Sequence, residues 1–211
     1  MTRFRPRVDN AMSWASLPAL LLLGGEATAA PRRTEFRFGS AVGGAVETAV
    51  APSVATGIAL GADVLADTGD IWSPSFRLSG IYVQSTAEAM PAVSVSFQLL
   101  TARFALCPLR LSLPSLTLRP CGELDYGRLR TRAGSDPDDA WVERDTAIVW
   151  LGAGIAQHAE VALGRYVALD AGVGLRWMAT NARFVILGDH TVHDVPQWSF
   201  GATLGILVRA P

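Results

Sequence analysis

Charged residues recur at alternate positions of segments whose other residues are mostly apolar. Alternate side chains of a strand share a face, so Arg103, Glu123 and Asp125 would point to the same side of a sheet. Buried charges persist only when they are paired and hydrogen-bonded. The pattern therefore predicts a network of ion pairs on one face. Its members are Arg37, Glu47, Asp63, Asp67, Arg77, Arg103, Arg119, Glu123, Asp125, Asp170, Arg176 and Arg209.

Few residues suit other chemistry. Asp189-His190 and His193-Asp194 bring two histidines and two aspartates within six residues, but their spacing matches no strong zinc signature. We therefore predict no metal site. No G-x-S-x-G, phosphate loop, dinucleotide fingerprint or CxxC occurs. No catalytic residue is assigned, and no cofactor is expected.

The two cysteines, Cys107 and Cys121, are predicted to form a disulfide. Each has a proline beside it, and a turn at Pro114-Ser115 would fold the intervening stretch into a hairpin that sets the cysteines opposite each other. Strand phase independently places both on the polar face. A pair of buried free thiols is the alternative.

The N-terminus resembles a secretory signal, which favours an oxidising compartment. Arginines 3, 5 and 7 precede an apolar stretch over residues 11–23, and Ala27-Thr28-Ala29 has the form of a cleavage site. We expect residues 1–29 to be a signal peptide and residues 30–211 the barrel domain. An uncleaved anchor is the alternative, but the apolar stretch is short and contains Pro18.

The alternation predicts strands over about 35–47, 56–67, 75–86, 92–107, 116–131, 144–157, 166–180 and 198–209. Three of them are irregular. The third carries Ile81 and Val83 on its polar face, and the sixth carries Ile148 and Trp150 there. In the fourth, Val95, Phe97 and Leu99 are expected outward and Gln98 inward, with a β-bulge near Leu100-Thr101 that restores the phase.

These strands predict an all-β fold, a single antiparallel up-and-down β-barrel with apolar residues outside and polar residues in the lumen. Half of the residues are hydrophobic and 18% are charged, yet no apolar run after the N-terminus is long enough for a spanning helix. The net charge of −1 and the lack of a basic patch give no reason to expect a nucleic-acid partner.

Over about residues 35–209 the chain resembles the small eight-stranded outer-membrane β-barrels. The resemblance implies an outer-membrane location, with outer-membrane lipid and the barrel-assembly machinery as partners. Members usually end in an aromatic residue read by that machinery, whereas this chain ends Val208-Arg209-Ala210-Pro211. With a periplasmic start, the connections near Pro52, Pro91, residues 134–139 and residues 181–196 would face outward.

We expect a non-enzymatic barrel with a polar, plugged lumen and a structural or surface-binding role. The outer loops do not specify an extracellular ligand. A narrow gated pore is one alternative. A lipid-acting outer-membrane enzyme is another, with His158 and Glu160 as the nearest pair for a Ser–His–acid site on the lipid face or rim. A soluble periplasmic barrel that binds a lipophile would need the opposite arrangement of polar and apolar faces.

Overall fold

A computed structural model describes residues 34–90, 93–135, 144–180, 183–186 and 190–210. The expected signal peptide and its cleavage site lie outside these residues. The described ranges contain no helix with the length and apolarity needed to cross a bilayer.

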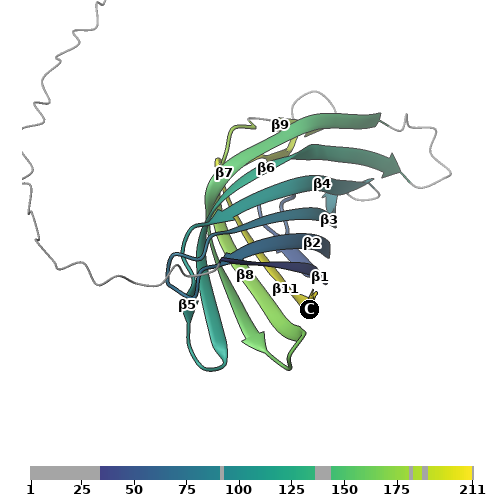
Figure 1. The fold of residues 1–211 in the computed structure, drawn as a ribbon. Helices are drawn as coiled ribbons and strands as arrows, with labels where there is room; N and C mark the ends of the chain where they lie inside the picture. Colours follow the sequence, from purple (N-terminus) through teal and green to yellow (C-terminus); the bar gives the residue numbers. More distant parts are fainter. Residues whose placement is uncertain (1–33, 91–92, 136–143, 181–182, 187–189, 211) are drawn as a thin grey trace, which may run out of the picture. The chain divides into compact units, whose positions relative to one another are not determined.

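Eight long strands form a closed antiparallel barrel (Figure 1). Each pairs with its neighbour in the sequence, and β1 pairs with β11 to close the ring. This confirms the predicted up-and-down barrel. The strands are β1 (Glu35–Glu47), β2 (Ala55–Asp67), β3 (Ser75–Met90), β4 (Val93–Cys107), β6 (Leu116–Ser135), β7 (Arg144–Ala162), β8 (Val167–Met178) and β11 (Trp198–Arg209).

Three short strands lie in the connections. β5 (Leu111–Ser112) pairs with the start of β6, while β9 (Arg183–Ile186) and β10 (His190–Asp194) form a separate hairpin. We call the end at which β1 begins the base and the end at which it finishes the mouth. The strand ends that flank the connections predicted to face outward all lie at the mouth.

The disulfide between Cys107 and Cys121 joins β4 to β6 at the base. The β4–β6 ladder ends at the pair Leu106 and Gly122, one position before the cysteines. Pro108 and Pro120 follow, and because proline has no N–H it cannot donate to a ladder. The covalent bond thus holds the two strands together where hydrogen bonding stops, and the hairpin turns at Pro114-Ser115 as expected.

The outer surface carries an apolar band. Its exposed side chains include Phe38 and Phe76 toward the base, and Tyr126 and the cross-strand pair Trp177 and Trp198 toward the mouth. Such a surface cannot face water without a large free-energy cost, but it suits lipid. The apolar outer face that the alternation predicts is therefore present.

Above this band, toward the mouth, the polarity of the barrel wall is inverted. Val95, Phe97 and Leu99 are buried inside, and Gln98 between them faces outward. The predicted orientation of this half of β4 was wrong, and so was the bulge near Leu100-Thr101, because β4 keeps one phase there. The register shift lies instead between Glu88 and Met90 of β3.

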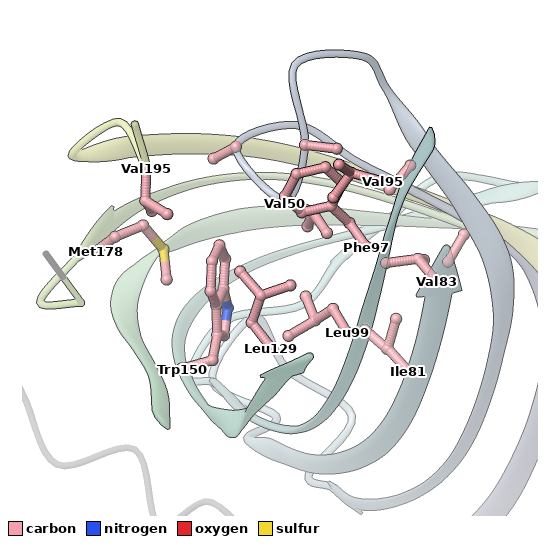
Figure 2. Packing of buried hydrophobic residues seen from close by; sticks show 14 residues of the cluster. Val50, Ile81, Val83, Val95, Phe97, Leu99, Leu129, Trp150, Met178 and Val195 are labelled. Carbon is pink, nitrogen blue, oxygen red and sulfur yellow. The ribbon is translucent and has the colours of Figure 1, made fainter. Parts of the chain in front are cut away.

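The irregular strands share the same explanation. Ile81, Val83 and Trp150 are buried with Phe97 in one apolar cluster inside the mouth, and Ile148 packs against it (Figure 2). The predicted alternation applies a single rule, apolar side chains outside, to the whole length of each strand. That rule fails above the apolar band, where water surrounds the barrel and the interior takes the apolar residues.

Connecting segments complete this cluster. Val50, in the β1–β2 connection, and Val195, which follows β10, are both buried in it (Figure 2). His193 donates from Nε2 to the carbonyl oxygen of Ala49 at 2.9 Å and contacts the Phe97 ring edge-on. Ala49 has a φ of 66°, in the left-handed region that disfavours side chains. Packing of this connection into the mouth therefore outweighs local backbone strain.

Substitutions at two neighbouring residues of β4 test whether Phe97 faces the interior and Gln98 the exterior. Phe97→Ala should destabilise the barrel by about 3–5 kcal/mol, because it empties a buried aromatic site. Gln98→Ala, on the outer face of the same strand, should change stability by no more than about 0.5 kcal/mol. Urea unfolding of the detergent-folded protein measures both. Equal losses of stability, or a larger loss for Gln98→Ala, would support the predicted orientation of β4, with Phe97 outward and Gln98 inward.

Candidate functional site in the barrel lumen

Below the apolar cluster, a group of five charged side chains crosses the lumen. Arg103 of β4 donates to both carboxylate oxygens of Asp125, at 2.7 and 2.9 Å, and to Glu47 at 2.7 Å. Arg176 of β8 reaches Glu47 at 2.6 Å and Glu123 at 3.0 Å. All five are buried. Two guanidiniums thus clamp three carboxylates contributed by β1 and β6.

A second group lies nearer the base. Arg77 of β3 makes a bidentate contact with Asp170 of β8, at 2.8 and 3.1 Å. Arg119 of β6 pairs with Asp63 of β2 at 3.4 Å and with Glu160 of β7. Arg209 of β11 also pairs with Glu160. Arg77–Asp170 and Arg119–Asp63 connect strands that are not neighbours in the ring, so these two pairs brace the barrel across its interior.

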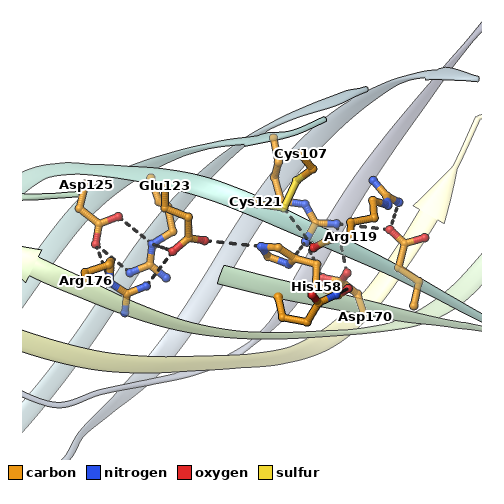
Figure 3. A network of polar contacts seen from close by, with 12 residues as sticks. Cys107, Arg119, Cys121, Glu123, Asp125, His158, Asp170 and Arg176 are labelled. Carbon is orange, nitrogen blue, oxygen red and sulfur yellow. Dashed lines mark hydrogen bonds and ion pairs between the residues drawn. A yellow bond between two sulfur atoms is a disulfide. The ribbon is translucent and has the colours of Figure 1, made fainter. Parts of the chain in front are cut away.

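His158 of β7 links the two groups (Figure 3). Its Nδ1 lies 3.0 Å from Nη1 of Arg77, and its Nε2 lies 3.5 Å from Oε1 of Glu123. Because a guanidinium only donates hydrogen bonds, Nδ1 must be the acceptor. The ring proton then sits on Nε2, facing Glu123. The histidine therefore accepts a hydrogen bond from the base group and lies within ion-pair distance of the mouth-side group.

Glycines directly across from these residues on adjacent strands provide the room for their side chains. A Cβ at Gly201 of β11 would overlap the ion pair between Arg176 and Glu47, and one at Gly172 of β8 would meet the His158 ring. The cavity left beside the network has a volume of about 40 Å³. That volume holds a few water molecules.

At the base rim, Asp67 collects a separate set of contacts. Partial burial by itself raises its pKa, but the N–H of Gly69 and the guanidinium of Arg110 donate hydrogen bonds to the carboxylate at 3.0 and 2.9 Å. Arg37 adds an ion pair at 3.3 Å. The balance lowers the pKa of Asp67 from its ordinary value, so this rim stays ionised at neutral pH.

The charged residues selected from the sequence lie in these three groups. Sequence reasoning missed Arg110, and it treated His158 and Glu160 as a pair on the lipid face or rim. Both are buried inside, where Glu160 is occupied by arginines. They share a strand phase with Trp150, and this phase could have placed them in the lumen had the inversion been recognised.

The histidine-containing segment covers residues 189–194. Asp189 lies outside the described residues, and His193 packs against Phe97 in the mouth. Among the residues that the structure describes, no three His, Cys, Asp or Glu side chains are grouped to hold a metal ion.

Comparison with known proteins rests on structure, because no protein-family profile and no curated protein matches the sequence. A major outer membrane protein from Thermus thermophilus superposes with a TM-score of 0.62 at 17% identity, over 83% of this chain and all of that one. Ail, the attachment invasion locus protein of Yersinia pestis, gives 0.48 at 10% identity, covering 83% of this chain and 97% of Ail. Neisserial surface protein A gives 0.45 at 14% identity, covering 82% and 96%.

The likeness to the Thermus protein concerns the fold alone. Together with the closed ring of eight strands and the apolar outer band, it defines the class of this chain. The chain is a small antiparallel β-barrel of the outer-membrane type.

Replacement of Arg103 measures how much the ion-pair network contributes to the free energy of unfolding. Arg103→Ala leaves Asp125 and Glu47 buried without their shared cation, so we expect a loss of about 3–5 kcal/mol in the free energy of unfolding. Arg37→Ala removes an exposed partner at the rim and should cost at most about 1 kcal/mol. Urea titration of both variants in the same detergent provides the comparison. A negligible loss at Arg103 would mean that the network does not support the barrel.

Proposed function

We propose that this chain is a non-enzymatic protein embedded in the outer membrane, with a closed lumen and a structural or surface-binding role. The observation that carries the proposal is the placement of charge. Side chains that cross the lumen are paired with one another, while the band around the outside is apolar. An eight-stranded barrel has an interior just wide enough for side chains to fill.

The lumen is occupied at two levels. Ion pairs cross it within the apolar band, and Val50, Phe97 and Trp150 pack inside the mouth. The small cavity beside the ion pairs supports a plugged interior over a continuous water-filled pore. The described part of the lumen also holds no apolar chamber for a lipophilic ligand, which the soluble-barrel alternative requires.

The mouth is the end that we assign to the cell exterior. The longest connection between barrel strands, from Met178 of β8 to Trp198 of β11, is at the mouth, whereas the base connections span 68–74, 108–115 and 163–166. Outer-membrane barrels have short periplasmic turns and longer outer loops. Any surface-binding role therefore belongs to the mouth.

An acyl-transfer role finds no support at His158. The ring faces Arg77 and Glu123 inside the barrel, away from the lipid on which such an enzyme would act. The non-enzymatic proposal accordingly assigns this histidine to the ion-pair network.

Gel mobility tests membrane embedding. Protein extracted from membranes in mild detergent should migrate differently when unboiled and boiled, because a closed hydrogen-bonded barrel resists the detergent until heated. An absent shift, with the protein soluble in buffer alone, would mean that polar and apolar faces are exchanged. A bound lipid would then be sought in the lumen.

Planar-bilayer recordings test the closed lumen. The wild-type barrel and Asp125→Ala should give no steady single-channel current, because the apolar packing in the mouth remains when one carboxylate is removed. A channel-forming porin in the same bilayer serves as the positive control. Steady currents in the wild type, altered by Asp125→Ala, would instead support a gated pore.

A further inference from the structure

An open groove lies on the outer surface of β6, β7, β8 and β11, within the apolar band. Its volume is about 620 Å³, which is in the range of ligand pockets. Ile155, Leu175 and Phe200 are exposed along its mouth side and follow one another in register. Gly122, which carries no side chain, is in register with Ile155. The lining nearer the base includes Pro108, Pro120, Gln157 and Val173.

Gly122 keeps this groove open. A Cβ built on the glycine would meet no atom within 4 Å, and the residue is exposed on the outer face of β6. A side chain there would therefore enter the groove without striking the barrel wall. The polar side chain in the lining, Gln157, turns back toward its own strand, where Nε2 donates to the carbonyl oxygen of His158 at 2.9 Å. The groove thus presents a mostly apolar lining to lipid.

A cationic group lies at the base end of two of these strands. Arg165 is in the turn between β7 and β8, and its guanidinium lies over the Tyr166 ring, 5.2 Å from the centroid. Leu163 and Val167, on either side, are exposed and apolar. The turn therefore marks the base edge of the apolar band, at the depth of lipid headgroups. The planar fork of arginine matches the oxygens of a phosphate.

The surface between this turn and the groove is apolar. On β7 and β8, Val161 is in register with Leu169, and both are exposed. Ala159 is in register with Ala171 one step nearer the groove. These small side chains leave a low path between the two strands, along which a hydrocarbon chain can lie.

The distance from the turn to the groove matches the length of one lipid. Gln157 and Val173 are in register, and each is eight residues from Arg165, which is about 26 Å along a strand. A strand tilt of about 35–45° reduces this to a depth of about 20 Å. Half of a bilayer with its headgroups is also about 20 Å thick. A lipid with its phosphate at the turn would therefore place its chain ends at the groove.

We propose that the groove and the turn together bind one phospholipid of the leaflet at the base, with an acyl chain in the groove and the phosphate on Arg165. This inference rests on the proposed embedding in the outer membrane. A phospholipid fits because the groove is continuous with the apolar band and the phosphate complements the charge at the turn. A soluble anion or a second barrel would use only one of these two features.

Lipid binding by the purified, folded barrel in detergent tests the proposal. Native mass spectrometry would follow the titration of the wild type, Gly122→Phe and Arg165→Gln with phosphatidylglycerol. We expect Gly122→Phe to weaken binding on the order of tenfold, because the ring fills the groove and removes the van der Waals contacts of the chain. Arg165→Gln should weaken binding about fivefold, the contribution of one basic residue near a membrane surface.

Gly80 provides a matched control for the groove. It is exposed on the outer face of β3, away from the groove, and a Cβ there would also meet no atom within 4 Å. Gly80→Phe should therefore bind phosphatidylglycerol like the wild type. Diacylglycerol, which has the chains but no phosphate, should bind more weakly to Gly122→Phe and equally to the wild type and Arg165→Gln.

Three results would overturn the proposal. The first is equal binding of phosphatidylglycerol by the wild type and either Gly122→Phe or Arg165→Gln. The second is an equal loss in Gly80→Phe, because any added ring on the outer face would then weaken binding. The third is displacement of phosphatidylglycerol by inorganic phosphate at equal concentration, since a soluble anion would then suffice.

The boiling shift separates this inference from the proposed function. If the wild type and Gly122→Phe both shift and bind phosphatidylglycerol alike, the membrane embedding stands and the groove assignment fails. If the wild type does not shift, the embedding itself fails. Should Gly122→Phe lose its shift, Gly122→Val replaces it, with an expected loss of about threefold because its side chain is smaller.

Discussion

The pairing of charges inside a narrow ring is the constraint on which this structure depends. Eight strands enclose a space that side chains must fill, and a charge placed there without a partner is strongly destabilising. Arg103 and Arg176 satisfy this condition by sharing Glu47, Glu123 and Asp125 between them. Because these residues come from β1, β4, β6 and β8, the network can form only when the ring is closed, so it couples ion pairing directly to barrel closure.

The level at which the surroundings of the barrel change from lipid to water is visible on both the outer and the inner faces of the strands. On the outside, β6 changes from Tyr126 to Arg128, and β4 changes from Leu100 to Gln98. On the inside, the change runs the other way, from ion pairs to the apolar cluster that contains Phe97 and Trp150. Each change follows from the surrounding solvent. Where lipid covers the outside, the interior can be polar, and where water covers it, apolar residues are buried within.

Glycines inside the ring make room for the larger side chains beside them. Gly172 of β8 lies directly across from His158, and Gly201 of β11 lies directly across from Glu47. A wall of larger residues there would displace the network. These glycines therefore leave the space inside the barrel that the side chains of the ion-pair network occupy.

The sequence alone determined the class of fold, the order of the strands, the inward face of the charged residues and the pairing of Cys107 with Cys121. These features depend on strand periodicity, a local hairpin and the cost of burying charge, which short stretches of sequence express. Only the tertiary structure decided the orientation of Phe97, the place of His158 and Glu160 in the lumen, and the partner of each arginine. Periodicity assigns residues to two faces but does not say which face is buried, because that depends on whether lipid or water lies outside at each level. Ion-pair partners likewise come from strands that meet only when the ring closes.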